Sequence, residues 1–98
     1  MKILLVCAAG MSTSLLVNSM KKVAGKEDEI NALPVNALEK NAADYDVILV
    51  GPQIRYKFNE VKKLCEGAGK PCGLIDMAAY GQMNGNAVYT QAKGLYQQ

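Results

Sequence analysis

Short apolar runs that show no alternation are the feature that most limits what this chain can fold into. Residues Lys2–Cys7 (KILLVC) are apolar after the first position, and Asp46–Val50 (DVILV) has the same character. A strand with one wet face alternates polar and apolar residues, whereas a strand buried on both faces is uniformly apolar. The two runs therefore predict inner strands of a parallel sheet that is covered on both faces.

Two weaker runs predict further strands. Cys72–Ile75 (CGLI) is short but apolar, and Ile30–Ala37 (INALPVNA) contains a proline at position 34. Proline has no N–H to donate to a neighbouring strand, so we expect the run that contains Pro34 to lie at an edge of the sheet.

Amphipathic segments lie between these runs. They predict helices over Ser14–Ala24, Ala37–Ala43, Ile54–Glu66 and Asn86–Tyr96. The side chains expected to face the core are Leu15, Leu16, Met20 and Val23 in the first helix and Phe58, Val61, Leu64 and Cys65 in the third. Gly67 and Gly69 are expected to close the third helix. Strands that alternate with helices indicate right-handed crossovers, so the predicted fold is an α/β domain over residues 1–98.

The composition excludes several kinds of chemistry. The chain has no histidine, which rules out a Ser-His-Asp triad, a Cys-His pair and a phosphohistidine on this chain. Its three cysteines, Cys7, Cys65 and Cys72, form no C-x-x-C, so we expect neither a disulfide framework nor a metal site, and no cofactor. A formal net charge of +2 is too small to indicate nucleic-acid binding.

The start of the chain has some features of a signal peptide but is interpreted differently. The apolar run from Ile3 to Ala9 is much shorter than the roughly 18 residues that span a bilayer. It also lacks a basic leading region and ends in a polar turn that contains glycine. We therefore expect a buried strand in a cytoplasmic protein.

The segment Cys7-Ala8-Ala9-Gly10-Met11-Ser12-Thr13-Ser14 is the best candidate for a functional site. A buried strand ends at a cysteine, and a loop of small and hydroxyl side chains leads directly into a helix. Small residues and one glycine let backbone N–H groups approach a ligand, and the helix N-terminus adds unpaired donors and a partial positive charge. The loop is thus suited to a phosphate, and the same field favours the thiolate of Cys7.

The plainer interpretation is that Cys7 only packs at the end of its strand and that Ser12 or Thr13 only caps the helix. A cysteine phosphatase would carry C-x5-R in this loop, but Thr13 occupies the place of the arginine. Without that charge, and without a histidine as general acid, hydrolysis loses its main stabilising groups. The loop is therefore expected to accept a phosphoryl group and hold it.

Three segments resemble the lactose/cellobiose-type enzyme IIB of the bacterial sugar phosphotransferase system. They are C-A-A-G-M-S-T-S-L-L at residues 7–16, G-P-Q-I at residues 51–54 and D-M-A-A-Y-G at residues 76–81, and the likeness covers nearly the whole chain. The resemblance implies a four-stranded parallel, open twisted sheet with helices on both faces. It also implies that Cys7 is the phosphorylated residue and that the loop Ala8–Ser14 binds the phosphoryl group.

The same resemblance implies the partners. A phosphohistidine on enzyme IIA would be the donor, and the acceptor would be a sugar bound by the membrane component, enzyme IIC. The Met11–Ser14 sequence favours the cellobiose/chitobiose branch over the lactose branch, which implies a β-linked disaccharide.

Residues after the other strands are expected to lie near Cys7. Gln53 and Tyr80 are candidates for a second wall of the site, where Gln53 or Tyr56 is expected near the phosphoryl group and the Tyr80 hydroxyl is a candidate donor to a phosphate oxygen. Asp76 is interpreted as a cap for the turn that follows it, and Arg55 as a solvated residue or a docking group.

Three alternatives to a phosphoryl carrier stay open. The first is a cysteine-dependent hydrolase, which would turn over an aryl phosphate. The second is a thiol redox protein in which Cys65 or Cys72 resolves an intermediate on Cys7. The third is an anion-binding regulator, for which replacing Cys7 would be nearly silent.

Overall fold

The computed structural model describes residues 1–7 and 14–97, and in them strands alternate with helices along the chain. The elements, in chain order, are β1 (Lys2–Cys7), α1 (Ser14–Val23), β2 (Glu29–Pro34), the 3₁₀ turn η1 (Val35–Ala37), α2 (Leu38–Asn41), η2 (Ala42–Asp44), β3 (Val47–Val50), η3 (Pro52–Lys57), α3 (Phe58–Ala68), β4 (Cys72–Leu74), α4 (Met77–Gly81) and α5 (Gly85–Tyr96).

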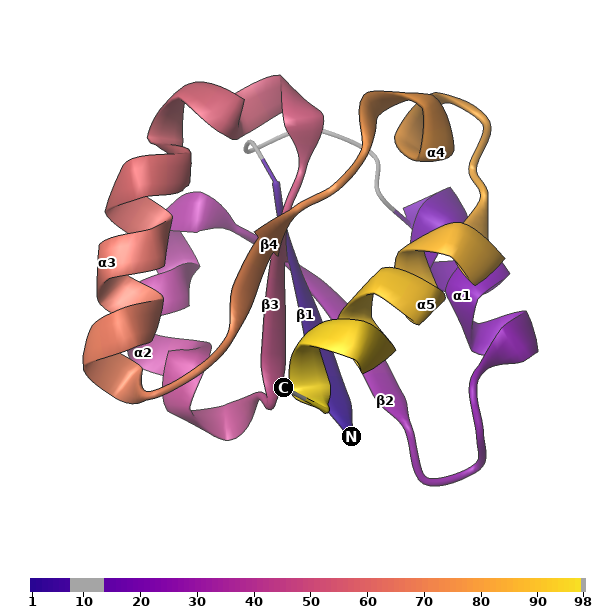
Figure 1. Cartoon of the computed structure of the whole chain (residues 1–98), viewed down its shortest axis with the longest axis horizontal. Helices are drawn as coiled ribbons and strands as arrows, with labels where there is room; N and C mark the ends of the chain where they lie inside the picture. The colour runs from indigo at the N-terminus through magenta and orange to yellow at the C-terminus, as the bar shows by residue number, and fades with distance from the viewer. Residues whose placement is uncertain (8–13, 98) are drawn as a thin grey trace.

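Four strands of the described residues form one parallel sheet in the order β2-β1-β3-β4. The order confirms that the run containing Pro34 is an edge strand, with Pro34 paired with Cys7 at its end. Figure 1 shows α1 and α5 on one face of the sheet and α2 and α3 on the other. The predicted α/β architecture, with both faces covered, is therefore confirmed.

The alternation of side chains along β1 and β3 supplies two cores. Ile3, Leu5, Val47 and Leu49 join the core under α1 and α5, while Leu4, Val6, Ile48 and Val50 join the core under α2 and α3. Both strands are buried along their lengths because each contributes to both cores. This is the physical reason for their uniformly apolar sequences.

The predicted ends of two elements are wrong. The third helix begins at Phe58 and not at Ile54, because Pro52 opens a 3₁₀ turn and Ile54 has non-helical angles (φ −118°, ψ 28°). That helix runs through Gly67, and only Gly69, with φ +72°, ends it in the left-handed conformation that glycine favours. The strand predicted over Ile30–Ala37 stops at Pro34, where pairing with β1 also stops.

The apolar stripe predicted for the first helix is also partly wrong. Leu16 and Met20 are buried, but Leu15 and Val23 are exposed. Val17 and Met20, which are one and four residues after Leu16, face the same core and complete the buried side of α1.

At the edge of the sheet opposite the end of β1, Asp28 is the centre of a polar cluster. Its carboxylate accepts hydrogen bonds from the Tyr89 hydroxyl, from the α-ammonium of Met1 at 2.9 Å and from the Gly25 N–H at 2.9 Å. The bond from Tyr89 is the largest of the effects that lower the pKa of Asp28 from 3.8 to about 2.

Because the folded state lowers this pKa, the stabilisation should be complete above about pH 5 and should be lost as the pH falls through 3.8 towards 2. Asp28→Asn should lower the free energy of unfolding at neutral pH by on the order of 1 kcal/mol. Urea unfolding of the wild type and the variant at several pH values tests this, since the difference should shrink on acidification. A difference independent of pH would contradict it.

Candidate functional site

The site is built where the carboxyl ends of three strands meet. Val6 pairs with Val50, and Val50 pairs with Leu74. The ladder continues past these pairs, because Gly51 N donates to Val6 O at 2.9 Å and Ile75 N donates to Val50 O at 2.9 Å. The residues that follow β3 and β4 therefore lie along the same edge as the end of β1, as the sequence predicted.

Cys7 is the last residue of β1 at this edge. Its side chain is 7% exposed, and its thiol donates to the carbonyl oxygen of Leu33 in β2 at 3.6 Å. The proposed cradle residues Ala8, Ala9, Gly10, Met11, Ser12 and Thr13 lie outside the described residues. Ser14 is the first residue of α1, so the helix begins seven residues after the thiol.

Tyr80 and Gln53 come together at the same edge. The Tyr80 side chain is 7% exposed and belongs to the core under α1 and α5. Burial, followed by the negative charge of Cys7, raises the pKa of Tyr80, and a hydrogen bond with the Gln53 side chain acts in the opposite direction. A raised pKa keeps the Tyr80 hydroxyl protonated, so it can donate a hydrogen bond to an anion.

The Gln53 side chain folds back over the end of β3. A Cβ on Gly51 would lie 3.2 Å from Gln53 Oε1 and 3.3 Å from the carbonyl oxygen of Val6. Gly51 thus leaves room for Gln53 to lie close to β1, one residue before Cys7. The two residues predicted as a second wall, Gln53 and Tyr80, therefore contact each other beside the candidate nucleophile.

A short helix that the sequence analysis missed carries Tyr80. α4 starts after Asp76, whose carboxylate Oδ2 accepts from the Ala79 N–H at 3.1 Å, so the prediction that Asp76 is a cap is confirmed. The signal that could have revealed the helix was this cap followed by Met77-Ala78-Ala79. Five residues are too few for a recognisable apolar period, so the sequence pattern after Asp76 indicates only a turn.

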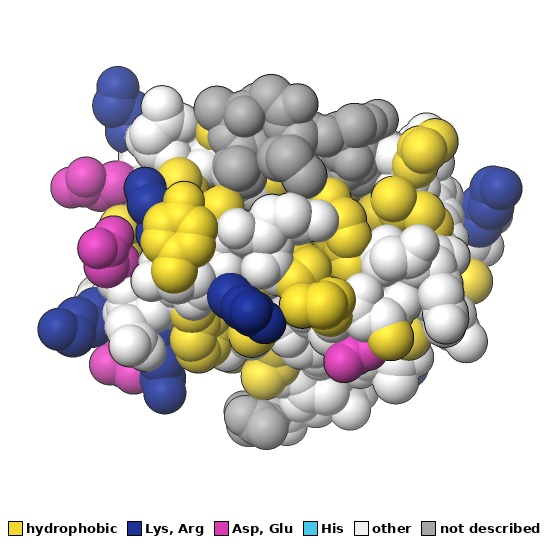
Figure 2. Space-filling view, turned by 90° about the horizontal axis from the view of Figure 1, so that it is seen from above, with side chains coloured by type: hydrophobic (Ala, Val, Ile, Leu, Met, Phe, Trp, Pro, Cys, Tyr) yellow, Lys and Arg dark blue, Asp and Glu magenta, His cyan; other side chains and the backbone are white. Residues whose placement is uncertain are grey.

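The surface around this edge is apolar. Tyr56 is 75% exposed, Met77 59% and Leu15 62%. Met77 begins α4, three residues after β4 ends, and lines a hollow of about 250 Å³ with Pro52, Gln53, Tyr80 and Gly81. Figure 2 looks onto this edge and shows apolar side chains gathered across it, with most charged side chains towards its sides. Arg55 is exposed near Tyr56.

The other two cysteines lie away from Cys7. Cys65 belongs to the core under α2 and α3, and Cys72 packs against that core. Cys65 is fully buried, as predicted, and Cys72 is partly buried at the start of β4. A hydrogen bond with Cys65, together with burial, raises the pKa of the Cys72 thiol. This contact keeps Cys72 in the thiol form, which is a poor nucleophile.

Neither a metal cluster nor a membrane span is found in the described part of the chain. No three His, Cys, Asp or Glu side chains of residues 1–7 and 14–97 are grouped to hold a metal ion. Among the helices of those same residues, none has the length and apolar character needed to cross a bilayer.

Comparison with known proteins gives one consistent family. Residues 2–91 match the family described as "PTS system, Lactose/Cellobiose specific IIB subunit". The chain is 44% identical over 101 residues to the galactose-specific EIIB component of Lactococcus lactis subsp. cremoris, with 95% of this chain and 94% of that protein covered. It is 40% identical over 97 residues to the oligo-beta-mannoside-specific EIIB component of Bacillus subtilis, with 96% and 94% covered.

A solved structure agrees with these sequence matches. The solution structure of a cellobiose-specific phosphotransferase IIB component from Borrelia burgdorferi superposes with a TM-score of 0.82 at 35% identity. The superposition covers 99% of this chain and 92% of that one.

Proposed function

Since this chain belongs to the family of lactose/cellobiose-specific IIB subunits of the phosphotransferase system, we propose that it is a phosphoryl carrier whose acceptor is the Cys7 thiolate. The observation that carries the proposal is the position of Cys7. It ends an inner strand at the edge where the residues that follow β3 and β4 also lie, and α1 begins seven residues later. Ligands of open parallel sheets bind beyond the carboxyl ends of the strands.

The proposed reaction has two transfers. The Cys7 thiolate attacks the phosphorus of a phosphohistidine on enzyme IIA, the S–P bond forms as the N–P bond breaks, and the imidazole leaves with the electron pair. A sugar hydroxyl then attacks the phosphocysteine, the O–P bond forms as the S–P bond breaks, and the hydroxyl proton passes to solvent. The thiolate is regenerated, so the chain acts as a protein-phosphocysteine–sugar phosphotransferase.

The proposed cradle is the segment Ala8–Ser14. Its backbone N–H groups would bind the phosphoryl oxygens, and the hydroxyls of Ser12, Thr13 and Ser14 would assist. The segment contains neither lysine nor arginine, which favours holding the group over hydrolysing it. No cofactor is needed for these steps.

The Tyr80 hydroxyl is proposed as a further donor to the phosphoryl group, with Gln53 orienting it. Its burial and its electrostatic interaction with Cys7 support this role. Tyr80→Phe should lower the rate of transfer to Cys7 by roughly tenfold, because a hydrogen bond to a charged group contributes about 1.5–3 kcal/mol. Rapid-quench measurement of phosphoprotein formation tests this.

Tyr96→Phe is the matched control for Tyr80→Phe, because Tyr96 is exposed at the end of α5 and lines a hollow with Asp46 and Lys70, away from Cys7. The control should react at the wild-type rate. Equal rates for both variants and the wild type would remove Tyr80 from the proposed site.

The apolar surface around Cys7 is proposed to dock enzyme IIA and then enzyme IIC. Tyr56 and Met77 are large and exposed, and the hollow of about 250 Å³ beside Tyr80 can receive one apolar side chain of a partner. A patch of this kind with a polar rim suits short-lived complexes. Arg55 lies at this patch as a group that can pair with an acidic partner residue.

The sugar is proposed to be a β-linked disaccharide such as cellobiose or chitobiose. The relatives' names include an oligo-beta-mannoside and cellobiose, and the Met11–Ser14 sequence favours the same branch. The galactose-specific relative is 44% identical, against 40% for the oligo-beta-mannoside-specific one, so transport assays with several sugars decide between them.

Intact-mass spectrometry after incubation with a phosphohistidine donor relay tests the proposal. The expected result is one added phosphoryl group that maps to the peptide containing Cys7. Release of free phosphate without an adduct would favour a hydrolase. A chain that neither accumulates the group nor releases phosphate would leave the redox and regulator alternatives.

A further inference from the structure

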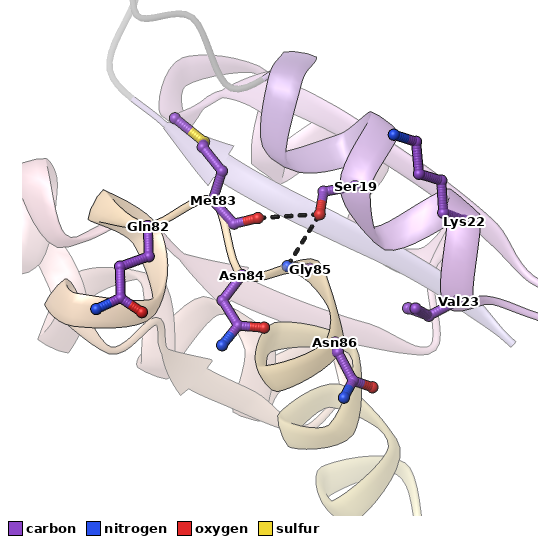
Figure 3. Close-up of a pocket in the computed structure, with 8 residues that line it drawn as sticks. All are labelled: Ser19, Lys22, Val23, Gln82, Met83, Asn84, Gly85 and Asn86. Carbon is purple, nitrogen blue, oxygen red and sulfur yellow. Dashed lines mark hydrogen bonds between the residues drawn. The ribbon is translucent and has the colours of Figure 1, made fainter.

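A single hydroxyl joins α1 to the turn between α4 and α5. Ser19 Oγ donates to the carbonyl oxygen of Met83 at 2.9 Å and accepts from the N–H of Gly85 at 3.1 Å. The partners are 64 and 66 residues away in the sequence. Figure 3 shows both bonds converging on Ser19, with the turn lying directly against α1.

The turn is shaped so that this hydroxyl can reach it. Met83 has φ +51°, a left-handed conformation uncommon for residues other than glycine. A Cβ on Gly85 would lie only 2.4 Å from the carbonyl carbon of Ser19, so the absence of a side chain permits the approach. The backbone geometry at both positions thus serves the contact with Ser19.

The same turn continues directly from Tyr80. Met83 N donates to the carbonyl oxygen of Tyr80 at 3.1 Å, and Asn84 N donates to that of Ala79 at 2.8 Å. At its other end, α4 is fixed by the Asp76 cap. A helix of five residues has little stability of its own, so its position depends on these two attachments and on the packing of Ala79 and Tyr80 in the core.

We propose that Ser19 is a positioning residue that holds Tyr80 against Cys7. The inference rests on the proposed function, because it assigns Ser19 to the geometry of the phosphoryl site. α1 packs against β1, which ends at Cys7, and the Ser19 hydroxyl ties the turn after α4 to α1, so it sets the distance between Tyr80 and the thiol. Loss of the hydroxyl lets α4 and Tyr80 move away from the thiol.

The test compares Ser19→Ala with Thr90→Ala. Thr90 Oγ1 on α5 also donates to a backbone carbonyl, that of Asn86 at 2.8 Å, but this bond is local and exposed. Ser19→Ala should lower kcat for phosphoryl transfer from enzyme IIA about fivefold, with KM changed less than about twofold, whereas Thr90→Ala should change neither. Ser19→Ala should still fold, because Gly85 N keeps its bond to Met83 O at 3.0 Å.

Two further variants separate positioning from a general structural effect. Ser19→Thr keeps the hydroxyl, and the hollow of about 400 Å³ beside Ser19 has room for its methyl group, so kcat should return to within about twofold of the wild type. In a Tyr80→Phe background, Ser19→Ala should lower kcat less than about twofold further, because the donor that Ser19 positions is already absent.

A measurement that needs no phosphoryl donor keeps the two proposals distinguishable. Alkylation of Cys7 by iodoacetamide, mapped by mass spectrometry, should be about threefold faster in Ser19→Ala than in the wild type or Thr90→Ala, because Tyr80 shields the thiol less. Equal rates of alkylation in all three proteins would overturn the inference. So would a double variant, Ser19→Ala with Tyr80→Phe, in which kcat falls by the product of the two single-variant factors. Faster alkylation in a chain that accepts no phosphoryl group would support the role of Ser19 and contradict the proposed function.

Discussion

Replacing Cys7 with serine should abolish formation of the phosphoprotein while leaving the fold intact. A serine hydroxyl is not ionised at neutral pH and no histidine of this chain can activate it, so transfer should fall by roughly 10⁴-fold or more. The substitution exchanges sulfur for oxygen at the end of a strand, and the hydroxyl can still donate to the carbonyl oxygen of Leu33. Stability should therefore change by only about 1 kcal/mol.

Cys72→Ser is the matched control for Cys7→Ser. Cys72 is also a cysteine at a strand end. It differs because it begins β4, is partly buried, and packs against the core that contains Cys65 of α3. This variant should accept the phosphoryl group at the wild-type rate. Intact mass after incubation with the donor relay distinguishes the two variants. A phosphoryl group on the Cys7→Ser chain, or its loss from the Cys72→Ser chain, would contradict the assignment of Cys7.

The sheet and the place of Cys7 could be predicted because one physical signal controls both. β1 and β3 contribute side chains to both cores, so their sequences are uniformly apolar and the change to polar or small residues marks where each strand ends. The place of Cys7 at the end of β1 is predicted correctly because the apolar run stops there and small and hydroxyl residues follow it in the sequence. The meeting of the connections at one edge then followed from parallel pairing alone.

What escaped prediction depended on short elements and on contacts distant in sequence. α4 is five residues long and is held by a cap and by the turn bound to Ser19, neither of which creates an apolar period. Without α4, the contact between Tyr80 and Gln53 could be expected only in outline. Ile54 was predicted as helical because its pattern fits a helix, but its side chain is buried in a 3₁₀ turn that Pro52 opens.

Gly85→Ala and Gly94→Ala should change stability in opposite directions, although both glycines lie in α5. A Cβ at position 85 would lie 2.4 Å from Ser19 C and 2.5 Å from Met20 N. These are backbone atoms, so α5 as a whole must move away from α1, and Val88 and Ala92 lose packing in the core. The free energy of unfolding should fall by about 3 kcal/mol.

A Cβ at Gly94 meets nothing within 4 Å. Alanine there should raise the free energy of unfolding by about 0.5–1 kcal/mol, because glycine loses more backbone freedom than alanine when a helix forms. Urea unfolding at equilibrium measures both variants. A fall of less than about 1 kcal/mol for Gly85→Ala would show that α1 and α5 are not in close contact at Ser19. Because the same contact carries the hydrogen bonds of Ser19, the folded fraction of Gly85→Ala should also transfer the phosphoryl group more slowly, whereas Gly94→Ala should transfer it at the wild-type rate.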